Sequence, residues 1–366
     1  MTEAKKSKIL NYINVFRGLA ILLIIAGHTM QFGKIGSLTQ RISVEFFAGG
    51  TALFIFISGF LFQHLSTKFE YKSYLSKKWT NVILPYLWTA IPGIIFCFLY
   101  PIKYGNAFEG LNPILQIPMM LTIGRVHNTP AWFIPMISLF FLTSWLILKL
   151  EKKGILYKLM PALFLITLLF PRIDVDYNSV LGLSYTAKYI AYAKYVIFGY
   201  IHFFSLYIFG MLCSAHKDLI DKFWNYRWLF ITLMLITATL NIYLGVLGFF
   251  TNGTISKIFL TIIVLAYLKH FDKWLLMHEK LNQILDFIAK YSFGLFFIHW
   301  YIFFLYNLIF DLPNVLPIVG NHIETFLLVT IRFIAVSLFS LFTLWGIKSL
   351  LKKLKPDCNT RSFIGV

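Results

Sequence analysis

Residues 12–32 read YINVFRGLAILLIIAGHTMQF, and Arg17 and His28 are the only basic side chains in this apolar run. The run contains no aspartate or glutamate. The hydrocarbon core of a bilayer is ~30 Å thick, so a helix that crosses it needs about 20 mostly apolar residues. This stretch therefore predicts a membrane-spanning helix that carries two basic groups.

The composition of the whole chain extends this prediction beyond the first run. Of 366 residues, 58% are hydrophobic and 13% are charged, and the mean hydropathy is +0.74. Soluble domains carry about 25% charged residues. These values exclude a soluble cytoplasmic enzyme, a secreted disulfide scaffold, a disordered chain and a nucleic-acid module. The three cysteines, Cys97, Cys213 and Cys358, lack metal or redox spacing, so they predict structural roles and no metal site.

Ten apolar runs are candidates for membrane spans. They lie at about 12–32, 44–65, 80–100, 131–149, 155–171, 195–213, 228–249, 255–270, 290–310 and 323–350. Such long, uniformly apolar runs favour helices over barrel strands. The sequence therefore predicts an all-α, polytopic transmembrane helix bundle of about ten spans. Residues 1–355 form one predicted domain, and residues 356–366 form a short cytoplasmic tail.

The basic residues predict the orientation of these spans. With the N-terminus in the cytoplasm, 23 of the 33 Lys and Arg residues fall in cytoplasmic segments, 8 fall in outer loops and two fall inside spans. This bias matches the positive-inside rule and places both termini in the cytoplasm. The net charge of +18 is therefore a sign of topology and does not indicate a nucleic-acid partner.

Ionisable side chains inside spans are the strongest functional signal, because each costs at least ~2.5 kcal/mol on insertion scales. The set consists of Arg17, His28, His64, His202, His299 and Arg332. Acidic residues lie only at span ends, which argues against the carboxylate relay of a proton-coupled transporter. Arg332 has no acidic neighbour in sequence, so we expect it to meet an anionic ligand or a cage of backbone carbonyls.

Arg17 and His28 lie eleven residues apart, so they share one stripe of a helix at ~16 Å separation along its axis. Small residues between them, Gly18, Ala20 and Gly27 among others, allow close approach of another helix or a ligand. Taken singly, Arg17 fits a snorkelling arginine and His28 fits an interhelical hydrogen bond. Together they suggest a phosphate-bearing donor on the cytoplasmic side and a hydroxyl acceptor on the outer side.

Five segments carry a resemblance to a known family. The string FRGLAILLIIAGH (16–28) resembles the first-helix signature of the acyltransferase family 3 integral membrane proteins. Other segments are similar to later motifs of that family, namely TALFIFISGFLF (51–62), SYLSKKWTNVILPYLW (73–88), PAWFI (130–134) and YSFGLFFIHW (291–300). The family commonly has a second arginine just before the proline of the third-helix motif, where this chain has Asn81 and Val82.

The resemblance implies an acyl transfer, usually of acetyl, from cytoplasmic acyl-CoA to a sugar hydroxyl of an extracytoplasmic or lipid-linked polysaccharide. It implies that His28 is catalytic, as general base or acyl carrier, and that Arg17 and Lys78 bind acyl-CoA. Lys78 also fits a solvated charge. Further candidates for lining the site are Ser58, Trp132, His299 and Arg332. Helix packing is an alternative for Ser58 and His299, and a membrane-interface role is one for Trp132.

The same resemblance sets expectations about partners and place. The donor substrate would be acetyl-CoA or another acyl-CoA, with no bound cofactor and no metal. The partners would be a cell-surface or lipid-linked glycan, the lipid bilayer and proteins of polysaccharide synthesis, and the location would be a bacterial plasma membrane. Two alternatives stay open, a transporter or flippase for a lipid-linked sugar and a structural subunit of a polysaccharide export complex. Broken helices and paired half-repeats would favour the flippase, and neither is evident in the sequence.

Overall fold

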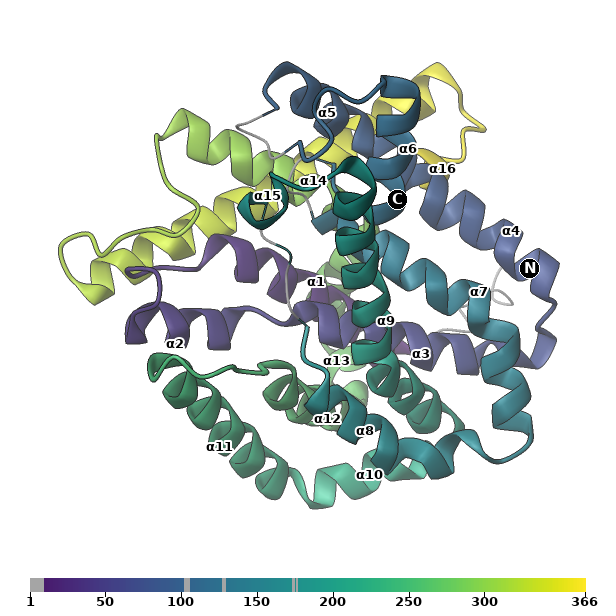
Figure 1. Ribbon diagram of the computed structural model, residues 1–366. Helices are drawn as coiled ribbons and strands as arrows, with labels where there is room; N and C mark the ends of the chain where they lie inside the picture. The colour runs from purple at the N-terminus through teal and green to yellow at the C-terminus, as the bar shows by residue number, and fades with distance from the viewer. Residues whose placement is uncertain (1–9, 102–105, 127–129, 173–174, 176) are drawn as a thin grey trace. The chain divides into compact units, whose positions relative to one another are not determined.

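The computed structural model describes residues 10–101, 106–126, 130–172, 175 and 177–366. These residues form helices and loops, with one isolated bridge between Phe32 and Leu316 (Figure 1). The predicted all-α class is therefore confirmed. The first nine residues, which belong to the predicted cytoplasmic N-terminal segment, lie outside the described residues.

The helices follow one another along the chain with short connections. The α-helices are α1 Asn11–Thr29, α2 Leu38–Phe47, α3 Gly50–His64, α4 Tyr71–Lys78, α5 Leu84–Leu99, α6 Pro113–Ile123, α7 Phe133–Lys152, α8 Met160–Leu169, α9 Tyr185–Ala215, α10 Asp218–Asn225, α11 Arg227–Val246, α12 Thr254–His270, α13 Asp272–Met277, α14 Glu279–Ile309, α15 His322–Leu354 and α16 Arg361–Ile364. Short 3-10 turns lie at Ser66–Lys68, Pro130–Trp132, Leu156–Leu159 and Asn178–Val180, and a π-helical turn lies at Trp79–Ile83.

Eight helical segments of the described chain are long and apolar enough to cross a membrane. They are Asn11–Thr29, Leu38–His64, Tyr71–Leu99, Pro130–Lys152, Tyr185–Ala215, Arg227–Val246, Glu279–Ile309 and His322–Leu354. The two remaining runs expected as spans form shorter helices, Leu156–Leu169 and the 17-residue α12. The chain is thus a polytopic helical protein, while the count of ten and the cytoplasmic termini stay predictions.

Helix α11 shows most clearly which solvent these helices need. Leu229, Leu235 and Leu240 each expose about half of their surface. Only 6% of the residues in the most apolar stretch of this helix are buried. Large exposed apolar surfaces of this kind are rare on soluble monomers. The exposed side chains of α11 therefore indicate contact with lipid.

The described residues fall into two compact units. Within the described ranges, unit 1 draws on residues 10–68, Leu206–Ser292 and Tyr306–Ser337, and unit 2 on Phe69–Ser205, Phe293–Leu305 and Leu338–Val366. The long helices α9, α14 and α15 therefore contribute residues to both units.

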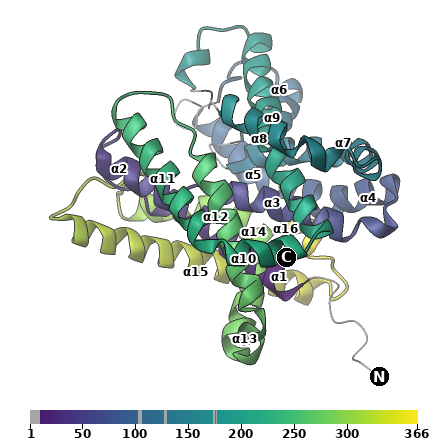
Figure 2. The same ribbon diagram turned by 90° about the horizontal axis from the view of Figure 1, so that it is seen from below.

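Unit 1 is built around α1, of whose 19 residues 12 are buried. Helix α1 packs against α2, α3 and α12, and α12 also packs against α10 and α11, as both views show (Figure 1 and Figure 2). Close backbone approach requires glycine at two positions. A Cβ on Gly50 would lie 2.7 Å from the backbone nitrogen of Ile24, and one on Gly59 would lie 1.9 Å from the carbonyl oxygen of Tyr207.

Unit 2 includes the segment predicted as a tail, which packs against helices of this unit. The rings of Trp88 in α5 and Phe363 in α16 are stacked with centroids 5.7 Å apart. A Cβ on Gly294 of α14 would lie 2.8 Å from the carbonyl oxygen of Ile364. Cys358 and Ile364 are both buried. Residues near 360 therefore form part of the packed structure of unit 2.

Candidate functional site

The N-terminal half of α1 holds Arg17 in a network of side chains from unit 1. Arg17 Nη2 donates to Asn14 Oδ1 at 2.9 Å, and Asn14 Nδ2 donates to Asp286 Oδ1 at 2.5 Å. The other carboxylate oxygen of Asp286 pairs with Lys290 Nζ at 2.5 Å. The neutral side-chain amide of Asn14 therefore links the guanidinium of Arg17 to the carboxylate of Asp286, and it orients the guanidinium.

The C-terminal end of α1 carries His28, which is half-buried in the last turn. Its neighbours are held tightly. Thr29 is fully buried and its hydroxyl donates to the carbonyl oxygen of Ile25 at 2.9 Å. A Cβ on Gly27 would lie 3.1 Å from the Cα of Ala48 and 3.1 Å from the carbonyl oxygen of Phe47. Because α1 is one unbroken helix, Arg17 and His28 lie on one stripe, as the spacing predicts.

Arg332 of α15 lies in the same unit and is 1% exposed. Its guanidinium donates to backbone carbonyl oxygens, the first of them that of Thr29, at 2.7 Å from Nε. Of the two surroundings expected for this arginine, the structure therefore provides the carbonyl cage. A role in lining the substrate site stays a prediction for Arg332.

A buried ion pair lies at the junction of α2 and α3, also in unit 1. Lys257 of α12 approaches Glu45 with Nζ 3.3 Å from Oε1 and also donates to the Glu45 backbone carbonyl. Asn241 Nδ2 donates to Glu45 Oε2 at 2.6 Å, and the Ser256 hydroxyl donates to Oε1 at 2.5 Å. The carboxylate is therefore satisfied on both oxygens. This cluster fixes the turn whose residues Phe47 and Ala48 pack against Gly27.

Ser58 of α3 makes a local contact in unit 1. Its hydroxyl donates to the carbonyl oxygen of Phe54, one turn earlier, at 2.8 Å. The adjacent Gly59 approaches the backbone of Tyr207 too closely for any side chain. These contacts fit the helix-packing alternative for this motif.

Lys78 lies in unit 2, where α4 passes into the π-helical turn Trp79–Ile83. Its ammonium lies 5.1 Å from the centroid of the Tyr74 ring and 4.7 Å from that of the Phe141 ring. It also borders a cleft of about 390 Å³ between α4, the π turn and α7. The walls are mostly apolar and consist of Leu75, Ser76, Lys78, Trp79, Ile83, Ser138, Phe141 and Leu142.

The π turn has a local cause in the sequence. Proline has no backbone N–H, so Pro85 cannot bond the carbonyl of Asn81 as a regular α-helix would. Within the turn, the side-chain amide of Asn81 donates to the carbonyl oxygen of Lys77 at 2.8 Å. Such π turns are rare and recur at functional sites. Here the turn begins directly after Lys78.

Trp132 lies in the short turn before α7 in unit 2, where a cation covers one face of its indole ring. The guanidinium carbon of Arg172 is 3.7 Å from the indole centroid, and Arg172 Nε donates to the hydroxyl of Tyr195 at 2.7 Å. Arg125 lies over the same Tyr195 ring, 5.4 Å from its centroid. The sequence did not single out Arg125 or Arg172. Any sugar that stacks on Trp132 would use the opposite face or displace Arg172.

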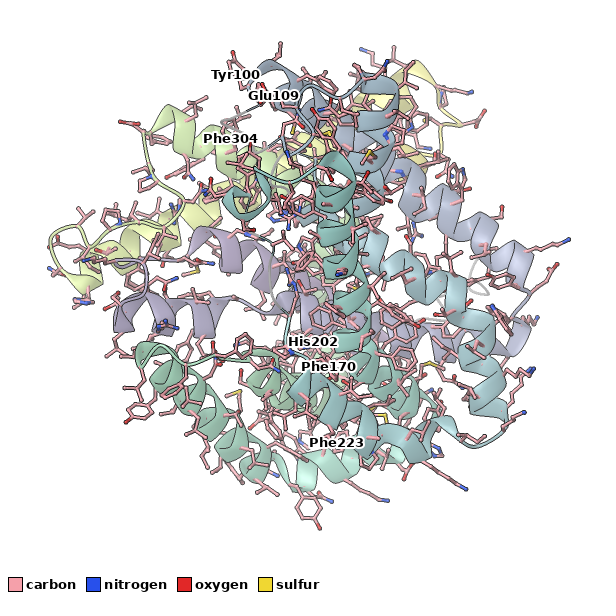
Figure 3. The ribbon with its side chains drawn as sticks, in the orientation of Figure 1. Tyr100, Glu109, Phe170, His202, Phe223 and Phe304 are labelled. Carbon is pink, nitrogen blue, oxygen red and sulfur yellow. The ribbon has the colours of Figure 1, made fainter. Side chains whose placement is uncertain are left out.

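Two histidines of unit 2 bond to backbone carbonyls. His299 is fully buried, and its Nδ1 lies 2.8 Å from the carbonyl oxygen of Leu295 in the same helix. His202 is also fully buried, with Nδ1 2.7 Å from the carbonyl oxygen of Phe170. Figure 3 labels both residues, which lie close together. For His299 this contact fits the packing alternative, and site lining stays a prediction.

The structure thus groups the predicted site residues within the two units. Arg17, His28, Ser58 and Arg332 belong to unit 1, and Lys78, Trp132 and His299 belong to unit 2. Within unit 1, Arg332 meets the end of α1 that carries His28. Sequence reasoning missed Asn14 and Asp286, although Asn14 lies three residues before Arg17 and therefore on the same helix face.

A comparison with family models gives one match. A model described as an acyltransferase domain matches residues 10–345, which is nearly the whole chain. This match confirms the resemblance of the five segments. No curated protein and no solved structure matches the chain.

Proposed function

Because this chain belongs to the acyltransferase family whose domain model it matches, we propose that it transfers acetyl, or another small acyl group, from acyl-CoA to a sugar hydroxyl. The chain is a multi-pass membrane acyltransferase. The proposed acceptor is an extracytoplasmic or lipid-linked polysaccharide, and the proposed location is a bacterial plasma membrane. The observation that carries the proposal is the placement of Arg17 and His28 on the single, largely buried helix α1.

The surroundings of Arg17 support a role in phosphate binding. Its Nη2 donates to the amide oxygen of Asn14, and Asp286 is paired with Lys290. The Asn14 amide orients the guanidinium, and guanidinium groups bind phosphate in a bidentate manner. Arg17 would therefore hold a phosphate of the CoA moiety.

The cleft beside Lys78 supports a second donor contact in unit 2. It has a volume of about 390 Å³, which falls within the range of small-molecule sites. One ammonium borders mostly apolar walls, so the cleft suits a ligand with an anionic group and an extended chain. Acyl-CoA has both features. We propose that Lys78 contacts a donor phosphate and that the cleft receives part of the pantetheine arm.

His28 would carry the chemistry. In direct transfer, its imidazole accepts the proton of the sugar hydroxyl, whose oxygen attacks the thioester carbonyl. The carbon–sulfur bond breaks, and the CoA thiolate leaves and takes up the proton. In the two-step alternative, an imidazole nitrogen first receives the acyl group and then passes it to the hydroxyl. Both routes conserve the acyl group and need no further reactant.

The test uses membrane vesicles that contain the protein and [14C]acetyl-CoA, and it counts label in glycan. We expect wild type to transfer label and His28→Ala to lose at least 99% of the rate at matched abundance. A matched control is His278→Ala, because His278 is exposed and its Nδ1 bonds within its own helix turn, 2.8 Å from the carbonyl of Trp274. Full activity of His28→Ala would remove the proposal.

The same assay separates the alternatives. A flippase moves a lipid-linked sugar without consuming acetyl-CoA, so its purified form would neither bind nor hydrolyse this probe. A structural subunit would show no dependence on His28 in any assay. Consumption of acetyl-CoA that depends on His28 is expected only for the acyltransferase.

A further inference from the structure

Arg332 is one of the largest fully buried side chains among the described residues. Its Nε donates to the carbonyl oxygen of Thr29 at 2.7 Å, and Nη2 lies 3.4 Å from that of Gln31. Nη1 donates to the carbonyl oxygen of Pro313 at 3.0 Å, and Nη2 lies 3.3 Å from that of Asn314. One guanidinium therefore joins the end of α1 to the loop between α14 and α15.

The Thr29 carbonyl lies at a helix end that needs hydrogen-bond donors. The last four carbonyls of an α-helix have no N–H donor within the helix. Helix α1 ends at Thr29, so its carbonyl is one of these. The partial negative charge at a helix C-terminus favours a nearby cation. A buried guanidinium with five N–H donors meets both requirements at once.

The same junction is closed by backbone and apolar contacts. Gly33 N donates to the carbonyl oxygen of Leu316 at 2.8 Å, and Leu316 N donates to that of Gln31 at 3.2 Å. The buried side chains Ala26, Met30, Leu316 and Val329 form one apolar cluster beneath these bonds. Residues 313–316 of this loop therefore pack against the end of α1 and bond to it.

We propose that Arg332 is a positioning residue for His28, and this inference rests on the proposed function. His28 directly precedes Thr29, whose carbonyl Arg332 holds. The Thr29 carbonyl cannot move without the helix, so the guanidinium fixes the rotation and axial position of the last turn of α1. It also binds these carbonyls with a planar fork, which lysine cannot reproduce. Arg332 acts through His28 and does not itself need to touch the substrate.

The first arm of the test measures how firmly Arg332 holds the end of α1, and it needs no activity assay. Hydrogen exchange followed by mass spectrometry is recorded on peptides covering residues 26–36 in wild type, Arg332→Met and Arg332→Lys. We expect exchange of the Met30 and Gly33 amides to be at least ten times faster in Arg332→Met and intermediate in Arg332→Lys. Thr330→Val is the matched control, because the Thr330 hydroxyl bonds the carbonyl of Phe326 in its own helix at 2.7 Å.

The second arm measures the consequence for the reaction. In vesicles with [14C]acetyl-CoA, rates are expressed per folded protein, which is quantified by thermal unfolding of the purified variants. Misplacing a reacting group by about 1 Å can cost ~10²-fold in rate. We expect Arg332→Met to lower kcat by about 10- to 100-fold with an unchanged KM for acetyl-CoA, and Arg332→Lys to lower it less.

Each outcome decides the inference. Wild-type kcat per folded Arg332→Met protein, or an activity loss that only follows the loss of folded protein, would overturn it. Unchanged exchange at residues 28–33 would overturn it as well. If His28→Ala is fully active, the proposed function fails and the positioning role falls with it. If His28→Ala is inactive while Arg332→Met is fully active, only the positioning role fails.

Discussion

The two ends of α1 are held in opposite ways. At the N-terminal end, Arg17 is oriented by side chains, through Asn14 to Asp286, and both Arg17 and Asn14 are half-buried. At the C-terminal end, the fully buried Arg332 grips the backbone beside His28. A side-chain acceptor can rotate with its guanidinium, whereas a backbone carbonyl moves only with its helix.

This contrast suits two different tasks. A phosphate-binding cation benefits from some freedom, because donors differ in how they enter a site. A base or nucleophile must meet the reacting atoms in a narrow geometry, and small displacements cost much of the rate. The adjustable end of α1 therefore fits donor binding, and the fixed end fits chemistry.

The largest expected difference between the two ends of α1 is in the kinetic parameter that each controls. His28→Gln should lower kcat by ~10²- to 10⁴-fold, the usual contribution of a general base or acid. Arg17→Gln should mainly raise KM for acetyl-CoA, because it removes binding shared by the ground state and the transition state. Initial rates in vesicles with [14C]acetyl-CoA measure both parameters. Equal effects of the two variants on the same parameter would contradict the division.

A smaller effect is expected from changing the charge of the amide beside Arg17. Asn14→Asp places a carboxylate where Asn14 Oδ1 now lies 2.9 Å from the guanidinium, so the ion pair competes with donor phosphate. We expect KM for acetyl-CoA to rise about 10-fold, with little change at high salt because salt screens half-buried pairs much less than exposed ones. Asn11→Asp makes the same change on α1 at a residue that bonds Asp272. A similar rise in Asn11→Asp would refute the local explanation.

The smallest effect tests packing at both ends. Cβ atoms at Gly18 and Gly27 would each lie 3.1 Å from backbone atoms of neighbours. The crowding opposes the gain of about 0.5–1 kcal/mol that alanine brings inside a helix. We therefore expect both alanine variants to change the free energy of unfolding by about 1 kcal/mol or less, measured by denaturation in mixed micelles. Only Gly27→Ala should reduce kcat several-fold, and equal activities would count against a fixed C-terminal end.

The sequence alone predicted the helix class, the helix that carries Arg17 and His28, and the carbonyl cage as one of two environments for Arg332. The length of an apolar run and the cost of an ionisable side chain inside it both depend on a short stretch of chain, so the sequence of that stretch reveals them. The partners could not be predicted, because Asn14 and Asp286 lie 272 residues apart and Arg332 and Thr29 lie 303 residues apart. Such pairs depend on which helices pack together, and a single sequence does not show this packing.

Two further features also escaped prediction. The apolar run at 155–171 begins with a 3-10 turn and ends in the ten-residue helix α8, so apolar composition overstated its helical length. Arg172 covers one face of Trp132, and these residues are 40 positions apart in the numbering. A motif such as PAWFI shows its own residues and not the side chain that folds onto them.

The buried pair of Glu45 and Lys257 has a consequence for how this protein can evolve. Either residue alone would leave an uncompensated charge in the interior, which costs about 3–5 kcal/mol, while two apolar replacements together can be neutral. Positions 45 and 257 should therefore exchange jointly among related sequences, with Ser256 and Asn241 released from constraint whenever the acid is lost. In a deep mutational scan the two sites would show strong sign epistasis, although neither residue needs to touch a substrate.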